Sequence, residues 1–157
     1  MTITVAERSR LLMPGMANFE PGVERYRVTG GAVTAVLMGA GDRLEIIDPE
    51  GCQPVEVAAF DRDGKSDPGL LGHSSGAPAT GIAAILAGNQ HDASRVADAL
   101  ALRGIDLGAT TAIHCFSQDS APAETIWMTA SADVVCVIGV PGGDMSPEEQ
   151  NTPTDVI

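Results

Sequence analysis

Short apolar segments, separated by turns rich in glycine and proline, recur along this chain, and this pattern most restricts its fold. Four of them follow one another at residues 25–29, 32–38, 43–48 and 52–60. Each alternates apolar and polar residues or is rich in β-branched ones, as strands do. Strands spaced by about 8–12 residues are typical of antiparallel sandwiches and barrels, so we expect the four to form an antiparallel meander.

The rest of the chain adds further strands and a helix. Residues 61–79 are polar and predict a loop, whereas the apolar residues 80–87 fit a strand or a helix. Alanine, valine and leucine recur every three or four residues over 93–101 and predict the main helix, with Asp92 as its cap. Three more strands are expected, at residues 110–116, 124–129 and 133–140. We therefore predict a β-rich α+β fold, an antiparallel sandwich or open barrel of about seven or eight strands with one main helix.

The chain has 157 residues, which fits one domain. Prolines and glycines interrupt residues 1–24, so these predict an N-terminal arm. Residues 25–141 form the predicted β-rich domain, and the acidic, proline-containing residues 142–157 predict a linker leading into further domains. Val156 and Ile157 resemble the opening of a strand, and a half-strand would leave backbone groups unpaired. We expect the chain to be part of a longer polypeptide.

The charge balance excludes several partners. Nine Lys and Arg residues oppose 21 Asp and Glu residues, a net charge of −12, so the phosphates of nucleic acid and an anionic membrane surface are not expected partners. An acidic field attracts small cationic amines, which are an expected ligand class. The longest apolar run, residues 134–140, is far shorter than the ~20 residues of a membrane helix. With three widely spaced cysteines and no targeting segment, a cytoplasmic location is expected.

Several side chains are candidates for chemistry. His91 and Asp92 form a pair that fits a metal ligand or a base with its orienting carboxylate, but Asp92 also fits a plain helix cap. His114 and Cys115 are neighbours on a predicted strand, so their side chains point to opposite faces and cannot easily share a metal. Spacings such as C-x-x-C are absent, so no metal site is expected.

The turn from Asp48 to Gln53 has two interpretations. In the first it is structural: Asp48 accepts backbone N–H groups and Gly51 takes a positive φ. In the second, Asp48, Gln53 and Glu56 bind a small molecule. Both interpretations remain open from the sequence.

The segment GDRLEIIDPEGCQPVEVAAF, residues 41–60, resembles the signature of the urea-carboxylase-associated family. The matching positions are Gly41, Leu44, Ile46, Asp48, Gly51, Gln53 and Phe60. Glu56 stands where that family usually has Asp. His91-Asp92 resembles the family's HD pair, residues 114–117 resemble its N-x-F-S segment, and residues 133–141 resemble the strand ahead of its C-terminal motif.

The resemblance implies a metal-binding family with His and Cys ligands, but this chain has no cysteine shortly after His91-Asp92, where residues 93–96 are Ala-Ser-Arg-Val, and none after Val140. His91 alone remains as a weak metal ligand, so the resemblance implies a degenerate copy without a cofactor of its own. Similar domains precede folate-binding domains that resemble the glycine-cleavage T-protein.

The resemblance therefore implies an N-terminal structural or assembly domain, itself not catalytic, in an oligomeric folate-linked demethylase. Such lyases convert trimethylamine N-oxide to dimethylamine and formaldehyde. Zinc and tetrahydrofolate would belong to the parent protein, and the partners would be downstream domains or a partner subunit. Two alternatives stay open: a stand-alone metal-dependent hydrolase resembling carboxyguanidine deiminase, and a small-molecule binding module.

Overall fold

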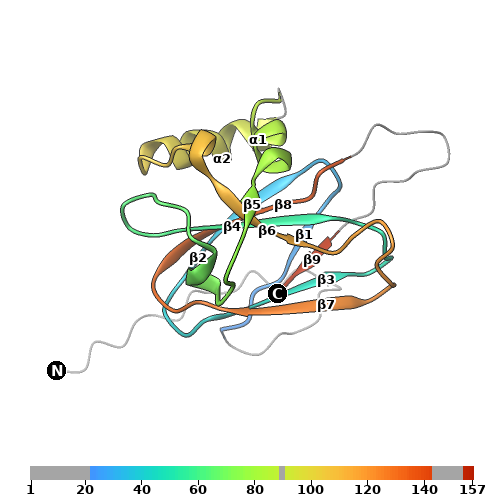
Figure 1. Ribbon diagram of the computed structural model, residues 1–157. Coiled ribbons are helices and arrows are strands. Elements are labelled where there is room, and N and C mark those ends of the chain that lie inside the picture. The colour runs from blue at the N-terminus through green and yellow to red at the C-terminus, as the bar shows by residue number, and fades with distance from the viewer. Residues whose placement is uncertain (1–21, 89–90, 143–153) are drawn as a thin grey trace.

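Two antiparallel sheets face each other in the computed structural model, which describes residues 22–88, 91–142 and 154–157 (Figure 1). The four-stranded sheet has the order β1 (Tyr26–Val28), β9 (Thr154–Val156), β3 (Arg43–Asp48) and β7 (Glu124–Thr129). The five-stranded sheet has the order β2 (Val33–Met38), β8 (Val134–Gly139), β4 (Val55–Phe60), β6 (Thr111–Cys115) and β5 (Ala77–Pro78). The sheets do not close into a barrel, so the fold is an open sandwich.

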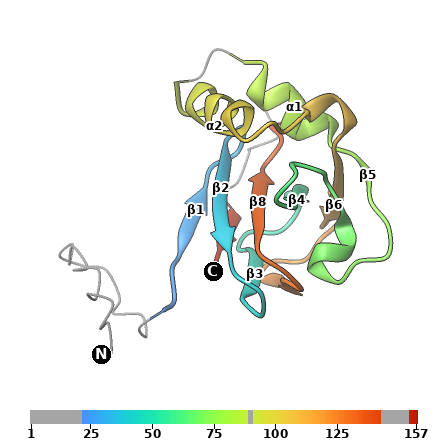
Figure 2. The same ribbon diagram turned by 90° about the vertical axis from the view of Figure 1, so that its left-hand side faces the viewer.

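Two α-helices, α1 (Thr80–Leu86) and α2 (His91–Leu102), lie side by side across one end of the five-stranded sheet (Figure 2). Two short 3-10 helices, η1 (Pro68–Leu71) and η2 (Leu107–Ala109), sit in the connections. The predicted β-rich α+β class is confirmed, and residues 80–87 prove to be helical. The expected loop 61–79 holds η1 and β5, and Leu71 of η1 is buried against the sandwich core.

The five-stranded sheet separates two apolar cores. The inner core lies between the sheets and includes Leu44 and Ile46 of β3. The outer core lies between this sheet and the helices and includes Ile82 of α1 and Leu100 of α2. All six residues of β4 are buried because both faces of that strand are covered. Five of the six residues of β4 are apolar, as expected of a strand buried on both faces, and the exception is Glu56.

Cys115 and Cys136 lie in the inner core. Burial raises the pKa of both thiols to about 12. Because the thiolate is the reactive form, these cysteines are unreactive at neutral pH. His114, next to Cys115, is exposed on the other side of β6, as the alternation of a strand predicts.

The predicted meander of the first four strands is wrong. Consecutive strands alternate between the sheets, so β1 and β3 lie in one and β2 and β4 in the other. Their partners come from later in the chain: β2 pairs with β8, β3 with β7, and β4 with β6 and β8. The turn at Gly31 therefore crosses between sheets, where its N–H donates to the carbonyl of Val140. Local alternation predicts a strand but does not select its partner.

The predicted linker 142–157 is wrong for its last residues. β9 lies between β1 and β3, and Val156 stands opposite both Tyr26 and Ile46. The N–H of Ile157 donates to the carbonyl of Glu45 at 2.7 Å, and a return bond joins the same two residues. The expected unpaired half-strand is therefore paired on both edges, because its partners come from distant parts of the sequence. Residues 1–21 of the predicted arm and 143–153 of the predicted linker lie outside the described residues.

Charged groups also attach β9 to β1. Arg25 and Arg27 both donate to the carboxylate of Asp155, the latter through Nε at 3.1 Å. Burial raises the pKa of Asp155, but the hydrogen bonds and charges of Arg27 and Arg25 together lower it below its ordinary value. The carboxylate therefore stays ionised and keeps both arginines over the sheet.

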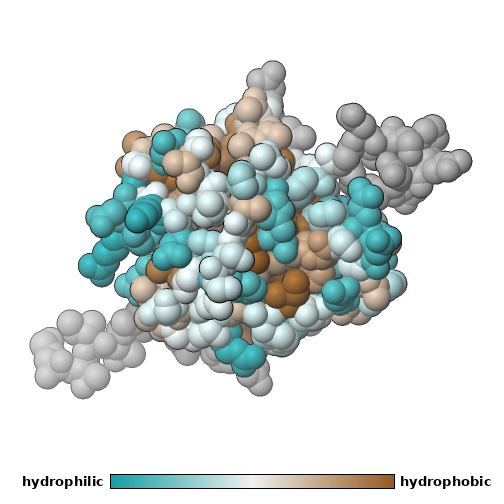
Figure 3. Space-filling view, viewed as in Figure 1, coloured by the Kyte–Doolittle hydropathy of each residue, from teal (hydrophilic) through white to brown (hydrophobic). Residues whose placement is uncertain are grey.

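Hydrophilic residues cover the loops at the sides of the view in Figure 3, and hydrophobic residues show mainly between the sheets and at the helices. No helix in the described part of the chain is long and apolar enough to cross a membrane.

We predict that Val156→Asp destabilises the domain by more than about 3 kcal/mol, because it buries an unpaired charge in the inner core. Chemical denaturation measures this change. Leu102→Asp is the control, since Leu102 is 90% exposed and its replacement should change the free energy of unfolding by less than about 1 kcal/mol. Equal effects of the two substitutions would contradict the position of β9 in the sandwich.

Candidate functional site

Asp48, at the end of β3, is fully buried and is surrounded by hydrogen-bond donors. Its Oδ1 accepts from the N–H of Gly51 at 3.0 Å, and its Oδ2 accepts from the N–H of Gln53 at 3.0 Å. The hydroxyl of Ser120 also donates to Oδ2, at 2.9 Å. This buried carboxylate therefore accepts three hydrogen bonds from within the protein, and its role in ligand binding stays a prediction. The prediction that Asp48 accepts backbone N–H groups of its own turn is confirmed.

The backbone of the same turn has two residues in the left-handed region, Gly51 at φ 81° and Cys52 at φ 63°. A Cβ on Gly51 would lie 2.7 Å from the carbonyl oxygen of Ser120 and 2.9 Å from the nitrogen of Pro122. Only glycine therefore fits this position, for reasons of both conformation and space. The positive φ expected for Gly51 is confirmed.

Glu56, on β4, holds the first turn of α1. Its Oε1 accepts from the N–H of Gly81 at 3.0 Å, and its Oε2 accepts from the N–H of Ile82 at 2.8 Å. The residue before the helix, Ala79, has no side chain that can cap these groups. Glu56 supplies the cap from a strand 26 positions away, and a carboxylate near a helix N-terminus is also favoured by the helix dipole.

His114 is the cross-strand neighbour of Glu56, with its Nδ1 3.8 Å from Oε1. Gln53 lies near by and donates from Nε2 to the carbonyl oxygens of Pro54 and Pro141. A Cβ on Gly81 would lie 2.5 Å from the Pro141 ring, so α1 packs closely here. Gln53 and Glu56 thus anchor neighbouring segments, and their proposed role in ligand binding stays a prediction.

The three histidines of the chain lie in different segments. His91 and Asp92 begin α2, but their side chains lie outside the described residues. His73 follows η1, and its N–H donates to the carbonyl of Pro68. Among the described side chains, no group of three or more His, Cys, Asp or Glu residues is arranged to hold a metal ion.

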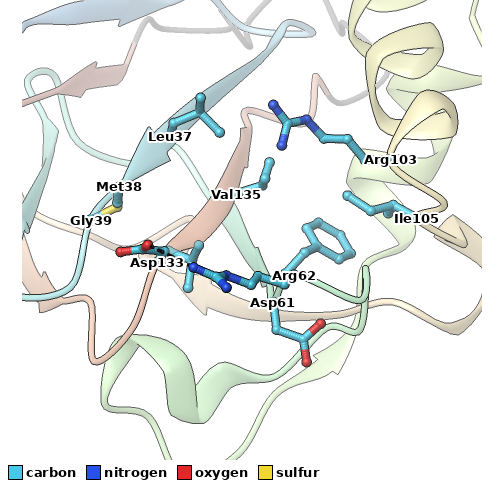
Figure 4. Close-up of a pocket in the computed structure, with 11 residues that line it drawn as sticks. Leu37, Met38, Gly39, Asp61, Arg62, Arg103, Ile105, Asp133 and Val135 are labelled. Atoms are coloured by element: carbon cyan, nitrogen blue, oxygen red, sulfur yellow. Dashed lines mark ion pairs between the residues drawn. The ribbon is translucent and has the colours of Figure 1, made fainter.

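A cavity that the sequence analysis missed lies elsewhere on the five-stranded sheet. It measures about 440 Å³ and is open to solvent beside the C-terminal end of α2 (Figure 4). Leu37 of β2, Val135 of β8 and Phe60 of β4 contribute to its lining. These three residues form one row, because Val135 is the register partner of both Leu37 and Phe60. Residues in one row share a face of the sheet, so the row forms an apolar floor.

Charged residues surround this floor. Arg103 and Ile105 come from the segment after α2, Arg62 from the segment after β4, and Asp133 from the start of β8. The guanidinium of Arg62 lies 3.8 Å from Asp133, and in Figure 4 Arg103 extends over the cavity toward Leu37. Because these residues are distant in sequence and form no motif, no sequence pattern could have identified the cavity.

Comparison with known proteins defines the class of fold. No protein-family profile matches the chain. The structure is similar to the crystal structure of a DUF1989 family protein from Silicibacter pomeroyi DSS-3, with a TM-score of 0.52 over 85% of this chain and 76% of that one. The sequence identity is 15%, so this similarity shows a shared β-rich fold.

The sequence itself is similar to trimethylamine-oxide aldolase of Ruegeria pomeroyi DSS-3. The two are 34% identical over 147 residues, which is 93% of this chain. The chain spans 18% of the length of that relative. The relationship that the family resemblance predicted is thereby confirmed, for one segment of a much longer protein.

We predict that Gly51→Val destabilises the domain by about 3 kcal/mol or more, since valine adds a clash with Ser120 to an unfavourable φ. Gly41→Val separates the two causes. Gly41 also has a positive φ, 89°, but a Cβ there would meet no atom within 4 Å. Chemical denaturation should show a smaller loss for Gly41→Val, about 1–2 kcal/mol. Equal losses would show that the contact with Ser120 is unimportant.

We predict that Glu56→Gln lowers the free energy of unfolding by about 1–3 kcal/mol, because an amide NH₂ would face a backbone donor of α1. Hydrogen exchange of the α1 amides, measured with chemical denaturation, should show faster opening of that helix. Glu45→Gln is the matched control on the four-stranded sheet. Unchanged protection of α1 in Glu56→Gln would refute the capping role.

Proposed function

We propose that this chain is a structural and assembly domain of a folate-linked demethylase that resembles trimethylamine-oxide aldolase. The similarity over 93% of the chain to one segment of that enzyme is the observation that carries the proposal. The domain itself does not catalyse the reaction. It supplies a folded unit on which downstream domains or a partner subunit assemble.

The hydrogen bonds of the family-like residues support a structural role. The Asp48 carboxylate accepts bonds from Gly51, Gln53 and Ser120, and the Glu56 carboxylate accepts two from α1. Groups that are buried and already bonded are unsuited to bind and release substrate, because removing their partners costs free energy. The part of the family signature that this chain keeps therefore maintains the fold.

The described residues do not fit a zinc ion. His114 and Cys115 lie on opposite faces of β6, so they cannot easily share a zinc ion, and no group of three or more His, Cys, Asp or Glu residues among the described side chains is arranged to hold one. In this proposal zinc and tetrahydrofolate belong to other parts of the parent enzyme. Conversion of trimethylamine N-oxide to dimethylamine and formaldehyde takes place there as well.

A chimera tests the proposal. This chain replaces the matching segment of the Ruegeria enzyme, and the release of formaldehyde from trimethylamine N-oxide is measured together with the size of the assembly. We expect the chimera to keep the native size and measurable activity, whereas a chimera carrying Gly51→Val should lose both. The Gly41→Val chimera is the control, because it has the milder backbone defect.

The chain alone provides the second arm of this experiment. We expect it to release no formaldehyde from trimethylamine N-oxide. Formaldehyde release by the chain alone would overturn the structural role. Tight binding of one zinc ion per chain, with hydrolysis of a carboxyguanidine, would favour the metal-dependent hydrolase instead.

A small-molecule binding module is the second candidate function. The open cavity beside α2 is the observation that favours it, since ligand sites are typically apolar clefts with a few polar groups. This function is compatible with a structural role, because the cavity shares no lining residue with the Asp48 turn or with the contacts of Glu56.

A further inference from the structure

The cavity beside α2 exists because the helices cover only part of the five-stranded sheet. Val137 and Ala58 are register partners one row away from the floor, and they are buried in the outer core beneath the helices. In the next row, Leu37 is 70% exposed. A single exposed leucine is common on protein surfaces and does not indicate a site. Leu37, however, continues an apolar row with Val135 and Phe60. The floor is therefore the edge of the outer core: Phe60 is buried, Val135 is half-buried and Leu37 is exposed.

The two carboxylates that line the cavity already have partners. Asp61 accepts from the N–H groups of Asp63 and Lys65, both at 2.9 Å. In Figure 4 its carboxylate points away from the space between Leu37, Val135 and Arg103. Asp133 accepts from the N–H of Ala40 at 3.1 Å and pairs with Arg62. Both carboxylates therefore already accept hydrogen bonds or pair with an arginine.

Arg103 differs from these groups. Among the described residues its guanidinium has no ion pair and no hydrogen bond, although it extends over the apolar floor. A guanidinium matches a carboxylate with two parallel hydrogen bonds. The exposed Arg62–Asp133 pair has a separation of 3.8 Å and contributes little to stability, so Arg62 can also turn toward a second anionic oxygen.

We propose that this cavity binds a small organic monoanion, with a carboxylate at Arg103 and an apolar group on the floor formed by Leu37, Val135 and Phe60. The volume of about 440 Å³ lies within the range of sites for small molecules, about 300–1,000 Å³. The local arrangement opposes the net charge of −12, which by itself would favour cations. The guanidinium of Arg103, rather than the charge of the whole chain, selects the ligand.

Benzoate is the probe for this site, and benzylammonium is its counterpart of similar shape and opposite charge. Two-dimensional NMR titration of the chain at about 0.15 M salt, where distant charges are screened, gives both the affinity and the location. We expect benzoate to shift the amides of residues 37–39, 103–105 and 133–135, and to bind at least about tenfold more tightly than benzylammonium. Preference for benzylammonium, or shifts elsewhere, would overturn the proposal.

Two variants of α2 and its flank identify the residue responsible. Arg103→Gln should weaken benzoate binding by about tenfold, which corresponds to the loss of a charge-assisted pair. Arg95→Gln is the matched control, because Arg95 is an exposed arginine of α2 that does not line this cavity. Leu37→Ser should weaken benzoate binding and leave any binding of free acetate unchanged. An equal effect of Arg103→Gln and Arg95→Gln would show that only general charge matters.

The ligand site and the structural role of the domain are tested independently. A chimera that lacks activity or the native assembly size would leave the benzoate-induced NMR shifts of the isolated chain unchanged. Absence of benzoate binding in folded protein, with its folding confirmed by the same NMR spectra, would overturn only the ligand site.

Discussion

The buried carboxylate of Asp48 joins two of the places where the chain passes from one sheet to the other. Residues 48–55 carry it from β3 to β4, and residues 115–124 carry it back from β6 to β7. Asp48 bonds to Gly51 and Gln53 in the first crossing and to Ser120 in the second. The carbonyl of Asp48 also accepts from the N–H of Ala123. The spacing of the sheets at this end depends on these bonds, because each replaces a hydrogen bond to water that a buried group has lost.

A second buried carboxylate, Glu56, has a similar role between the sheet and the helices. It caps α1 through Gly81 and Ile82, and the close approach at Gly81 brings Pro141 against the same point. Polar residues that looked like a binding constellation in the sequence therefore connect layers. The surface left without such a connection is the far end of the five-stranded sheet, where the apolar floor and Arg103 meet.

The structural role of Asp48 and Glu56 bears on how this chain is related to its longer relative. Sequence similarity to trimethylamine-oxide aldolase extends across 93% of the chain, and the fold resembles that of a DUF1989 family protein. The retained signature residues stabilise crossings and caps, which a domain needs whether or not it is catalytic. Similarity of this kind preserves the fold before it preserves chemistry, since function depends on the particular side chains of a site.

Much of the architecture could be predicted from local sequence. The alternation in β3 and the mostly apolar sequence of β4 identify strands, and the need for glycine at Gly51 follows from the turn chemistry of Asp48. The secondary structure of residues 80–87 could not be predicted, because the cap that favours a helix there comes from Glu56 on a distant strand. The candidate site was predicted least well, since Leu37, Arg103 and Val135 have no common motif.

The sequence by itself determined where strands and the main helix form, because those depend on periodicity and turn residues within a few positions. It also predicted Asp48 as an acceptor for backbone donors of its own turn, with ligand binding as the open alternative, and the structure shows those hydrogen bonds. Only the tertiary structure decided which strands pair, that β9 fills the gap between β1 and β3, and that an uncovered row beside Arg103 forms a cavity. These features depend on contacts between segments as far apart as Tyr26 and Val156, and such contacts arise from the packing of whole layers.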